Sequence, residues 1–248
     1  MRENQQLTEL NFLKNRLFSV IAHDLKGPVF ALHTLFKNMQ RHDLTGEEIK
    51  TLLPEVVKDL GSTTDQLDHM LQWVKSQMNE ECVEPETVEI SDIVREVLQF
   101  LHLQLEAKRI HINIRMHRPA YVFADREMVN LVLRNLISNA IKFTPEKGMI
   151  SLDAREDEGQ IEVFVIDSGT GITPDIMQRL MEGSQHTTMG TSNEKGTGMG
   201  LMLVRVFLSR NGGRLNICSE PGHGSTFSFT LPKGLYDVTD RSKKISKG

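Results

Sequence analysis

The chain has 248 residues, a length that suits one large domain or two modest ones. Its net charge of −4 argues against a nucleic-acid-binding surface, and its two cysteines, Cys82 and Cys218, have neither disulfide-framework nor metal-site spacing. No apolar run approaches the roughly 20 residues that a membrane-spanning helix needs, and the polar N-terminus is not a signal peptide. We expect a cytoplasmic location for this segment, with membrane anchoring of a longer protein left open.

Residues 8–40 are predicted to form a long amphipathic helix, because apolar residues recur there at steps of three and four. Pro28 should bend this helix, since proline removes a backbone hydrogen bond. His23 lies about 200° around the helix from the apolar residues two positions away on either side, at roughly 100° per residue, so it points into water. For these residues alone, an exposed His23–Asp24 pair is most simply a solvated helix face.

A second helix begins near Thr45, which has Glu48 three residues later in the pattern of a capping box. An apolar residue then recurs every seven positions, at Leu53, Leu60, Leu67 and Val74. Two helices joined by a short turn make a hairpin with too little core to stand alone, and pairing two hairpins gives a four-helix bundle. We therefore predict that residues 1–80 form a dimerisation hairpin and that the protein is a homodimer.

Residues 81–90 are acidic and contain a proline, so we interpret them as a linker to a second domain, residues 91–235. The predicted helices of that domain are 91–108, capped by Ser91, 126–143, capped by Asp125, and 199–210, ended by Asn211-Gly212-Gly213. The predicted strands are 110–116, 121–124, 149–154, 161–167, 214–219 and 225–231. This order predicts an α+β sandwich, with helices on one face of a mixed sheet. The tail, residues 236–248, is expected to be disordered.

Three motifs of the second domain carry chemistry. Asn135, Asn139 and Lys142 lie at i, i+4 and i+7 of one predicted helix and so form one row. Amide oxygens can bind a hard divalent cation, and a lysine ammonium can lie against phosphate oxygens. An asparagine-rich helix edge is, taken alone, more often plain polar surface.

The second motif is VIDSGTGI, residues 165–172, in which an apolar strand ends in Asp167 and two glycines follow, Gly169 and Gly171. An acid at a strand end can accept a hydrogen bond from an exocyclic amine such as that of adenine, and glycines let backbone approach a ligand closely. An ordinary Asp-Ser-Gly turn is the alternative. The apolar strand before Asp167 favours a pocket floor.

The third motif is EKGTGMGL, residues 194–201, whose glycines lead directly into a predicted helix. Backbone N–H groups at a helix N-terminus can bind a polyphosphate. The motif is neither a P-loop nor a dinucleotide fingerprint, because no Gly-Lys-Ser/Thr follows it and no strand precedes it. Residues 181–195 before it are polar and rich in Thr, Gly and Ser, which predicts a mobile lid.

In order and spacing, these motifs resemble the catalytic core of bacterial sensor histidine kinases of the two-component type. HDLKGP is similar to the H box, NLISNAIKFT to the N box, DSGTGI and GTGMGL to the two glycine boxes, and GSTFSFTLP to the closing strand of the ATP-binding (Bergerat) domain. The similarity covers nearly the whole chain. It implies a protein histidine kinase that uses ATP and Mg²⁺, phosphorylates itself, and passes the phosphoryl group to an aspartate on the receiver domain of a separate response regulator.

The resemblance also implies a role for each matching residue. His23 would be the phosphoacceptor, Asp24 would orient it, and Asp167 would bind adenine with support from Thr226. The residues implied for the rest of the nucleotide site are Asn135 and Asn139 for Mg²⁺, Lys142 and Lys195 for phosphates, and Gly169, Gly171, Gly196, Gly198 and Gly200 for the nucleotide loops.

Two departures from the family pattern bear on activity. Leu180 stands where the family's lid usually has an aromatic residue, which puts normal lid closure in doubt. Gly27 stands four residues after the histidine, where kinases that also dephosphorylate their partner usually have Thr or Asn. Because glycine has no side chain to position a water molecule, the phosphatase activity is predicted to be weak.

Two other functions fit parts of the pattern. An ATPase of the same nucleotide fold would hydrolyse ATP with a glutamate, but the corresponding helix position holds Asn135 and the His23–Asp24 pair would then have no role. A degenerate kinase that acts as a dimeric signalling scaffold would explain the unusual lid, although the asparagines, Asp167 and the glycines are all present.

Overall fold

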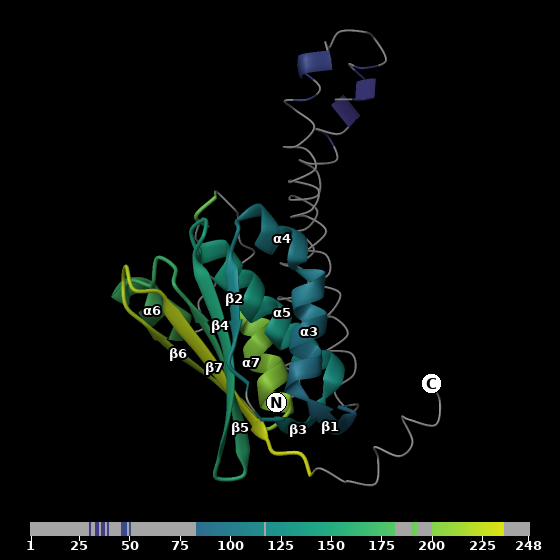
Figure 1. The fold of residues 1–248 in the computed structure, drawn as a ribbon, viewed down its shortest axis with the longest axis vertical. Helices are drawn as coiled ribbons and strands as arrows, with labels where there is room; N and C mark the ends of the chain where they lie inside the picture. The colour runs from purple at the N-terminus through teal and green to yellow at the C-terminus, as the bar shows by residue number, and fades with distance from the viewer. Residues whose placement is uncertain are drawn as a thin grey trace, which may run out of the picture. The chain divides into compact units, whose positions relative to one another are not determined.

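The computed structural model describes residues 30, 33–34, 36–37, 39, 46–48, 50, 83–116, 118–181, 190–192 and 200–235 (Figure 1). The chain divides into two compact units, Met1–Asn79 and Glu80–Gly248. The described positions of the first unit are all helical. Most of the predicted hairpin, residues 1–80, and the tail, residues 236–248, lie outside the described residues.

The second unit is built on a five-stranded mixed sheet with the strand order β2-β4-β5-β7-β6. Its strands are β2 His111–Ile114, β4 Met149–Asp157, β5 Gln160–Asp167, β6 Arg214–Ser219 and β7 Ser225–Pro232. β2 runs parallel to β4, whereas the other neighbours are antiparallel. Every second residue of β5 is buried from Ile161 to Asp167, which is the period-2 pattern of a strand with one face against a core.

The central helix, α5, spans Arg126–Phe143 as predicted. It begins after Asp125, whose side chain accepts a hydrogen bond from the backbone N–H of Met128 at 3.0 Å, so this N-cap is confirmed. Its last residue is Phe143, and Thr144 is the C-cap with an extended backbone, because the proline that follows disfavours a helical conformation at Thr144. Its buried residues recur at helical spacing: Val129, Val132, Leu133, Asn135, Leu136, Ile137, Ala140 and Ile141.

Two further helices pack beside α5, namely α3 (Ile90–Phe100) and α7 (Gly200–Arg210). Figure 1 shows these helices on one side of the five-stranded sheet, which confirms the predicted sandwich of helices on a mixed sheet. α7 stops at Asn211, where Gly212 adopts a φ of +70° and the N–H of Gly213 donates to the carbonyl of Leu208 at 2.7 Å.

The predicted linker 81–90 is wrong over most of its length. Pro85–Glu89 forms strand β1, which pairs antiparallel with β3 (Tyr121–Asp125) in a two-stranded sheet. The domain therefore begins before residue 91. The strand β1 was not predicted because most of its residues are polar or charged and exposed, and because its partner strand lies more than thirty residues away.

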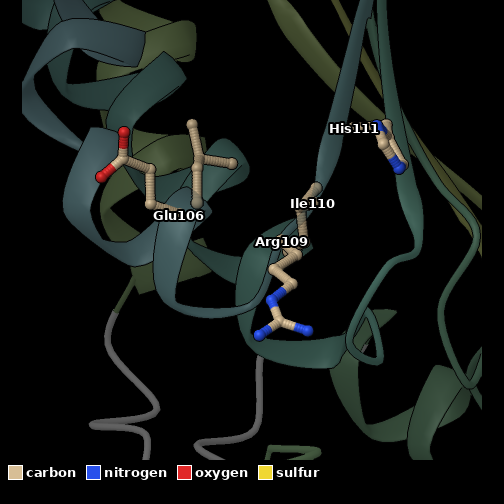
Figure 2. Close-up of a pocket in the computed structure, with 5 residues that line it drawn as sticks. Glu106, Arg109, Ile110 and His111 are labelled. Atoms are coloured by element: carbon tan, nitrogen blue, oxygen red, sulfur yellow. The ribbon is translucent and has the colours of Figure 1, made fainter.

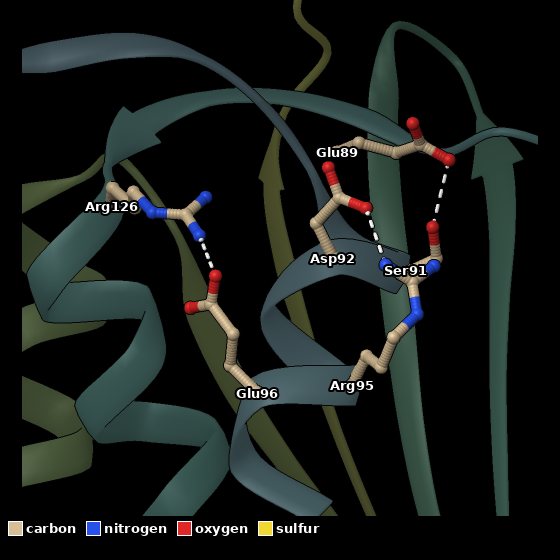
Figure 3. A network of polar contacts seen from close by, with 6 residues as sticks. All are labelled: Glu89, Ser91, Asp92, Arg95, Glu96 and Arg126. Carbon is tan, nitrogen blue, oxygen red and sulfur yellow. Dashed lines mark hydrogen bonds and ion pairs between the residues drawn. The ribbon is translucent and has the colours of Figure 1, made fainter. Parts of the chain in front are cut away.

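Ser91 does not cap the following helix, contrary to the prediction. α3 begins at Ile90 with Glu89 at the N-cap, and the hydroxyl of Ser91 donates to the carboxylate of Glu89 at 2.7 Å (Figure 3). Glu96 of the same helix forms an ion pair with Arg126, which ties α3 to the first residue of α5.

Two helix predictions also need correction. The predicted helix 91–108 breaks at Leu101, so that a separate helix α4 spans His102–Ala107. Helix α6, Pro174–Met181, was not predicted. Within the described part of the chain, no helix has the length and apolar character that crossing a bilayer requires.

Replacing Asp125 with Ala should lower the free energy of unfolding by about 1–2 kcal/mol, because the first turn of α5 loses its side-chain acceptor. Asp125→Asn should keep most of the stability, since its amide oxygen can still accept from Met128. Urea unfolding of the isolated second unit measures the difference. Equal unfolding midpoints for Asp125→Ala and the wild type would contradict this assignment.

Candidate functional site

Asp167 is the last residue of β5, and its side chain is buried where the strand passes into a loop. Its Oδ1 accepts hydrogen bonds from the backbone N–H groups of Gly169 at 2.8 Å and Ser225 at 3.2 Å. Burial raises the pKa of Asp167 above the usual 3.8, although the two backbone hydrogen bonds act in the opposite direction. Both bonds use the same oxygen, and the second carboxylate oxygen has lone pairs that can accept from a ligand.

The loop after β5 packs so closely that only glycine fits at two of its positions. A Cβ atom on Gly169 would lie 2.5 Å from the carbonyl oxygen of Phe143, at the end of α5. A Cβ atom on Gly171 would lie 2.0 Å from the carbonyl oxygen of Glu220, and this residue has a φ of +67°. The glycines of this motif therefore let backbone from three parts of the chain meet around the buried carboxylate.

The asparagine row lies on α5 as predicted, with Asn135 4% exposed and with Asn139 and Lys142 half-buried. The Nδ2 of Asn135 donates to the carbonyl of Leu131 at 2.9 Å, which leaves Oδ1 on the other side of the amide. A Cβ atom on Gly200 would lie 2.7 Å from that Oδ1, so the first residue of α7 lies directly against Asn135. An amide oxygen is a ligand that suits a hard cation such as Mg²⁺.

A backbone hydrogen bond joins the two motifs. The N–H of Thr170, in the loop after Asp167, donates to the carbonyl of Phe143 at 3.2 Å. The structure therefore brings together α5, the loop after β5 and the start of α7. Each of these segments is more than twenty residues from the next along the chain.

Residues 124–235 match the family described as Histidine kinase-, DNA gyrase B-, and HSP90-like ATPase. The chain is also 29% identical over 234 residues to the adaptive-response sensory kinase SasA of Prochlorococcus marinus, a match that covers 93% of this chain and 62% of that protein. These similarities support the catalytic core of a sensor histidine kinase in this chain.

Two solved structures of histidine kinases resemble this chain. The catalytic domain of histidine kinase ThkA matches with a TM-score of 0.53 and 27% identity, over 60% of this chain and 96% of that one. ThkA in complex with the response regulator protein TrrA matches with a TM-score of 0.67 over 93% of this chain and 64% of that one, and its 21% identity shows the fold alone. The chain spans about three fifths of the length of the curated relatives that it matches first.

Thr226 does not lie on the face of the sheet that its predicted role beside Asp167 requires. In the register of β5 and β7, Asp167 faces Ser225, and Thr226 faces Ile166. Because side chains alternate between the two faces of a sheet, Thr226 lies on the opposite face from Asp167. Ser225 is the residue that sequence reasoning missed, since a strand start at residue 225 does not reveal which of two adjacent hydroxyls faces the helices.

Five predicted site residues lie outside the described residues: His23, Asp24, Lys195, Gly196 and Gly198. Leu180 is described and lies in α6, where its carbonyl accepts a hydrogen bond from Arg205 of α7 at 3.0 Å. This hydrogen bond joins α7 to the end of α6, which leads into the predicted lid of residues 181–195.

A separate shallow hollow of about 350 Å³ lies where α4 turns into β2 (Figure 2). Figure 2 shows Glu106, Arg109 and His111 of its lining pointing in different directions. Arg109 forms an exposed ion pair with Glu146 at 3.3 Å. The polar groups of the hollow do not converge on one point, so we assign it no ligand.

The free energy of unfolding of Asp167→Asn should increase relative to that of the wild type as the pH rises. The raised pKa means that the native protein keeps the Asp167 proton over a pH interval in which the unfolded chain has lost it, so wild-type stability falls as the pH rises from 3.8 through the native pKa. The amide keeps an oxygen for Gly169 and Ser225 but has no charge to bury. Urea unfolding of both proteins between pH 4 and pH 8 measures this, and a stability difference that does not change with pH would contradict it.

Proposed function

We propose that this protein transfers the γ-phosphoryl group of ATP to its own His23 and then passes it to an aspartate on the receiver domain of a separate response regulator. The observation that carries the proposal is the buried carboxylate of Asp167, held by two backbone N–H groups beside the asparagine-bearing helix of a histidine kinase-like ATPase domain. The resemblance to ThkA, which was solved in complex with a response regulator protein, supports the choice of partner.

The nucleotide is proposed to bind with its adenine amine on the second carboxylate oxygen of Asp167. Ser225 takes the supporting role first given to Thr226, because it shares a face with Asp167. The remaining contacts are proposed for Asn135 and Asn139 with Mg²⁺, Lys142 and Lys195 with phosphates, and Gly169, Gly171, Gly196, Gly198 and Gly200 with the nucleotide through backbone. Mg²⁺, when bound, would neutralise charge on the phosphate oxygens.

The proposed reaction needs a neutral imidazole, which is abundant near pH 7 at the reference histidine pKa of about 6.5. Asp24 would accept the hydrogen bond of one ring nitrogen and so fix the tautomer. Nε2 of His23 would then attack the γ-phosphorus in line, forming the N–P bond as the bond to the leaving ADP oxygen breaks. In such transfers, positioning and charge neutralisation supply most of the rate.

We also propose that the first unit forms a four-helix bundle in a homodimer. Three large apolar side chains at its described helical positions are exposed in the single chain: Phe30 at 68%, Phe36 at 55% and Met39 at 38%. Burying such side chains against a second copy would remove apolar surface from water. A sensory input would then act by changing how the ATP-binding domain reaches His23.

His23→Ala should abolish phosphorylation from γ-labelled ATP. ATP binding measured by titration calorimetry should stay within about twofold of the wild type, because the proposed nucleotide site is made of residues of the second unit. His33→Ala is the matched control, since it removes another histidine from the same unit, and it should keep the label. The wild-type label should resist base and be lost in acid, as expected for a phosphohistidine.

Retained labelling in His23→Ala would defeat the assignment of the phosphoacceptor. Steady phosphate release without any labelled protein would instead favour an ATPase of the same nucleotide fold. No binding of Mg²⁺-ATP at all would favour a scaffold without enzymatic activity.

Gly27→Asn should raise the rate at which this kinase dephosphorylates a receiver domain that it has itself labelled. The asparagine amide would be able to hold a water molecule near the phosphoryl group, which glycine cannot do. Loss of label from the purified receiver, with and without the variant, measures the effect. The prediction of weak phosphatase activity would be contradicted if the wild type dephosphorylated the receiver at the rate usual for kinases with Thr or Asn at this position, and Gly27→Asn did not increase that rate.

A further inference from the structure

A buried lysine lies at the C-terminal end of α5. Lys108 follows α4, and although lysines are mostly exposed in proteins, it is only 8% exposed. Its Nζ donates to the carbonyl oxygens of Ile141 and Lys142, both at 2.9 Å, and to the hydroxyl oxygen of Thr191 at 2.8 Å, with a longer contact of 3.4 Å to the carbonyl of Thr144. The three donors of the ammonium therefore have partners from two distant parts of the chain.

Thr191 is bound to the same end of α5 in its own right. Its backbone N–H donates to the carbonyl of Lys142 at 3.0 Å. Its hydroxyl lies 3.0 Å from the carbonyl of Thr144 and 3.1 Å from that of Lys142, so it donates to one of them while it accepts from Lys108. The hydroxyl is thus the bridge between a cation and the last turn of the helix.

The end of a helix leaves carbonyl groups without partners inside the helix and carries a partial negative charge. A lysine on the protein surface could donate to these carbonyl groups and interact favourably with the partial negative charge. Here the cation is buried, and it also holds a residue from the segment that precedes the glycine motif of residues 196–200. The turn to which that segment is bound contains Lys142, which the proposed function assigns to the phosphates.

We propose that Lys108 is a positioning residue for nucleotide binding, which fixes Thr191 against the last turn of α5. This inference rests on the proposed function, because the ligand concerned is Mg²⁺-ATP. A chain segment held in place before binding loses less conformational entropy when the nucleotide binds, so the anchor increases affinity without contacting the ligand.

The test compares variants of the full chain. Lys108→Met removes the cation but keeps most of the side-chain volume, and Thr191→Val removes the hydroxyl but keeps the shape. Thr191→Ser is the matched control that retains the hydroxyl. Val97→Ala, a truncation of a buried residue of α3, is the control for lowered stability. Titration with Mg²⁺-ATP gives Kd, thermal unfolding gives Tm, and hydrogen exchange of the Thr191 amide is followed without nucleotide.

Lys108→Met and Thr191→Val should each raise Kd about tenfold, because losing a hydrogen bond to a charged group can lower the anchored fraction of the segment to about a tenth, and Kd rises as the inverse of that fraction. The double variant should be no weaker than Lys108→Met, because the two groups act as one unit. The Thr191 amide should exchange at least about tenfold faster in both single variants. Thr191→Ser should keep the wild-type Kd, and Val97→Ala should lower Tm while its Kd stays unchanged.

A Kd within twofold of the wild type for the Lys108 and Thr191 variants would overturn the inference, as would additive effects in the double variant or unchanged exchange of the Thr191 amide. If Lys108→Met does not fold, the comparison of Thr191→Val with Thr191→Ser decides the question by itself. If the wild type binds no ATP, the proposed function fails, and unchanged exchange would show separately that the anchor fails.

Discussion

The candidate site depends on one buried carboxylate. Placing the charge of Asp167 away from water is unfavourable, and the backbone N–H groups of Gly169 and Ser225 offset part of that cost. One donor belongs to the loop after β5 and the other to the start of β7. The hydrogen bonds to the carboxylate therefore also hold these two segments together. The glycine of the turn before β7, Gly224, is required by the same arrangement, since a Cβ atom there would lie 2.0 Å from the carbonyl oxygen of Asp167.

The helix α5 connects this carboxylate to the rest of the site, and it is held at both ends. At its start, Asp125 accepts from the first turn, and at its end the ammonium of Lys108 contacts the last carbonyl groups. Both contacts follow the helix dipole, with an acid at the positive end and a cation at the negative end. A helix held in this way keeps Asn135 against the start of α7 and presents its last turn to the loop after β5.

Some of this could be predicted from local sequence. The boundaries of α5 follow from a capping aspartate and a threonine-proline end, and β6 has the predicted bounds because glycines precede it. Asp167 stood out because an apolar strand ends on it. The prediction failed where a partner distant in sequence decides the structure. Pro85–Glu89 is a strand only because β3 is available to pair with it. The role of Ser225 depends on the register of β7 against β5, which a strand pattern does not specify.

By itself, the sequence determined the five strands of the main sheet, the cap of α5 and the position of Asp167 at a strand end, because these depend on residues within one turn or one strand of each other. Only the tertiary structure decided which hydroxyl faces Asp167, and which lysine lies buried at the end of α5. Lys108 looks like any surface lysine in a helical sequence, because its acceptors are 33 to 83 residues away. Hydrogen bonds between such distant groups form only after the layers have packed, so no local pattern records them.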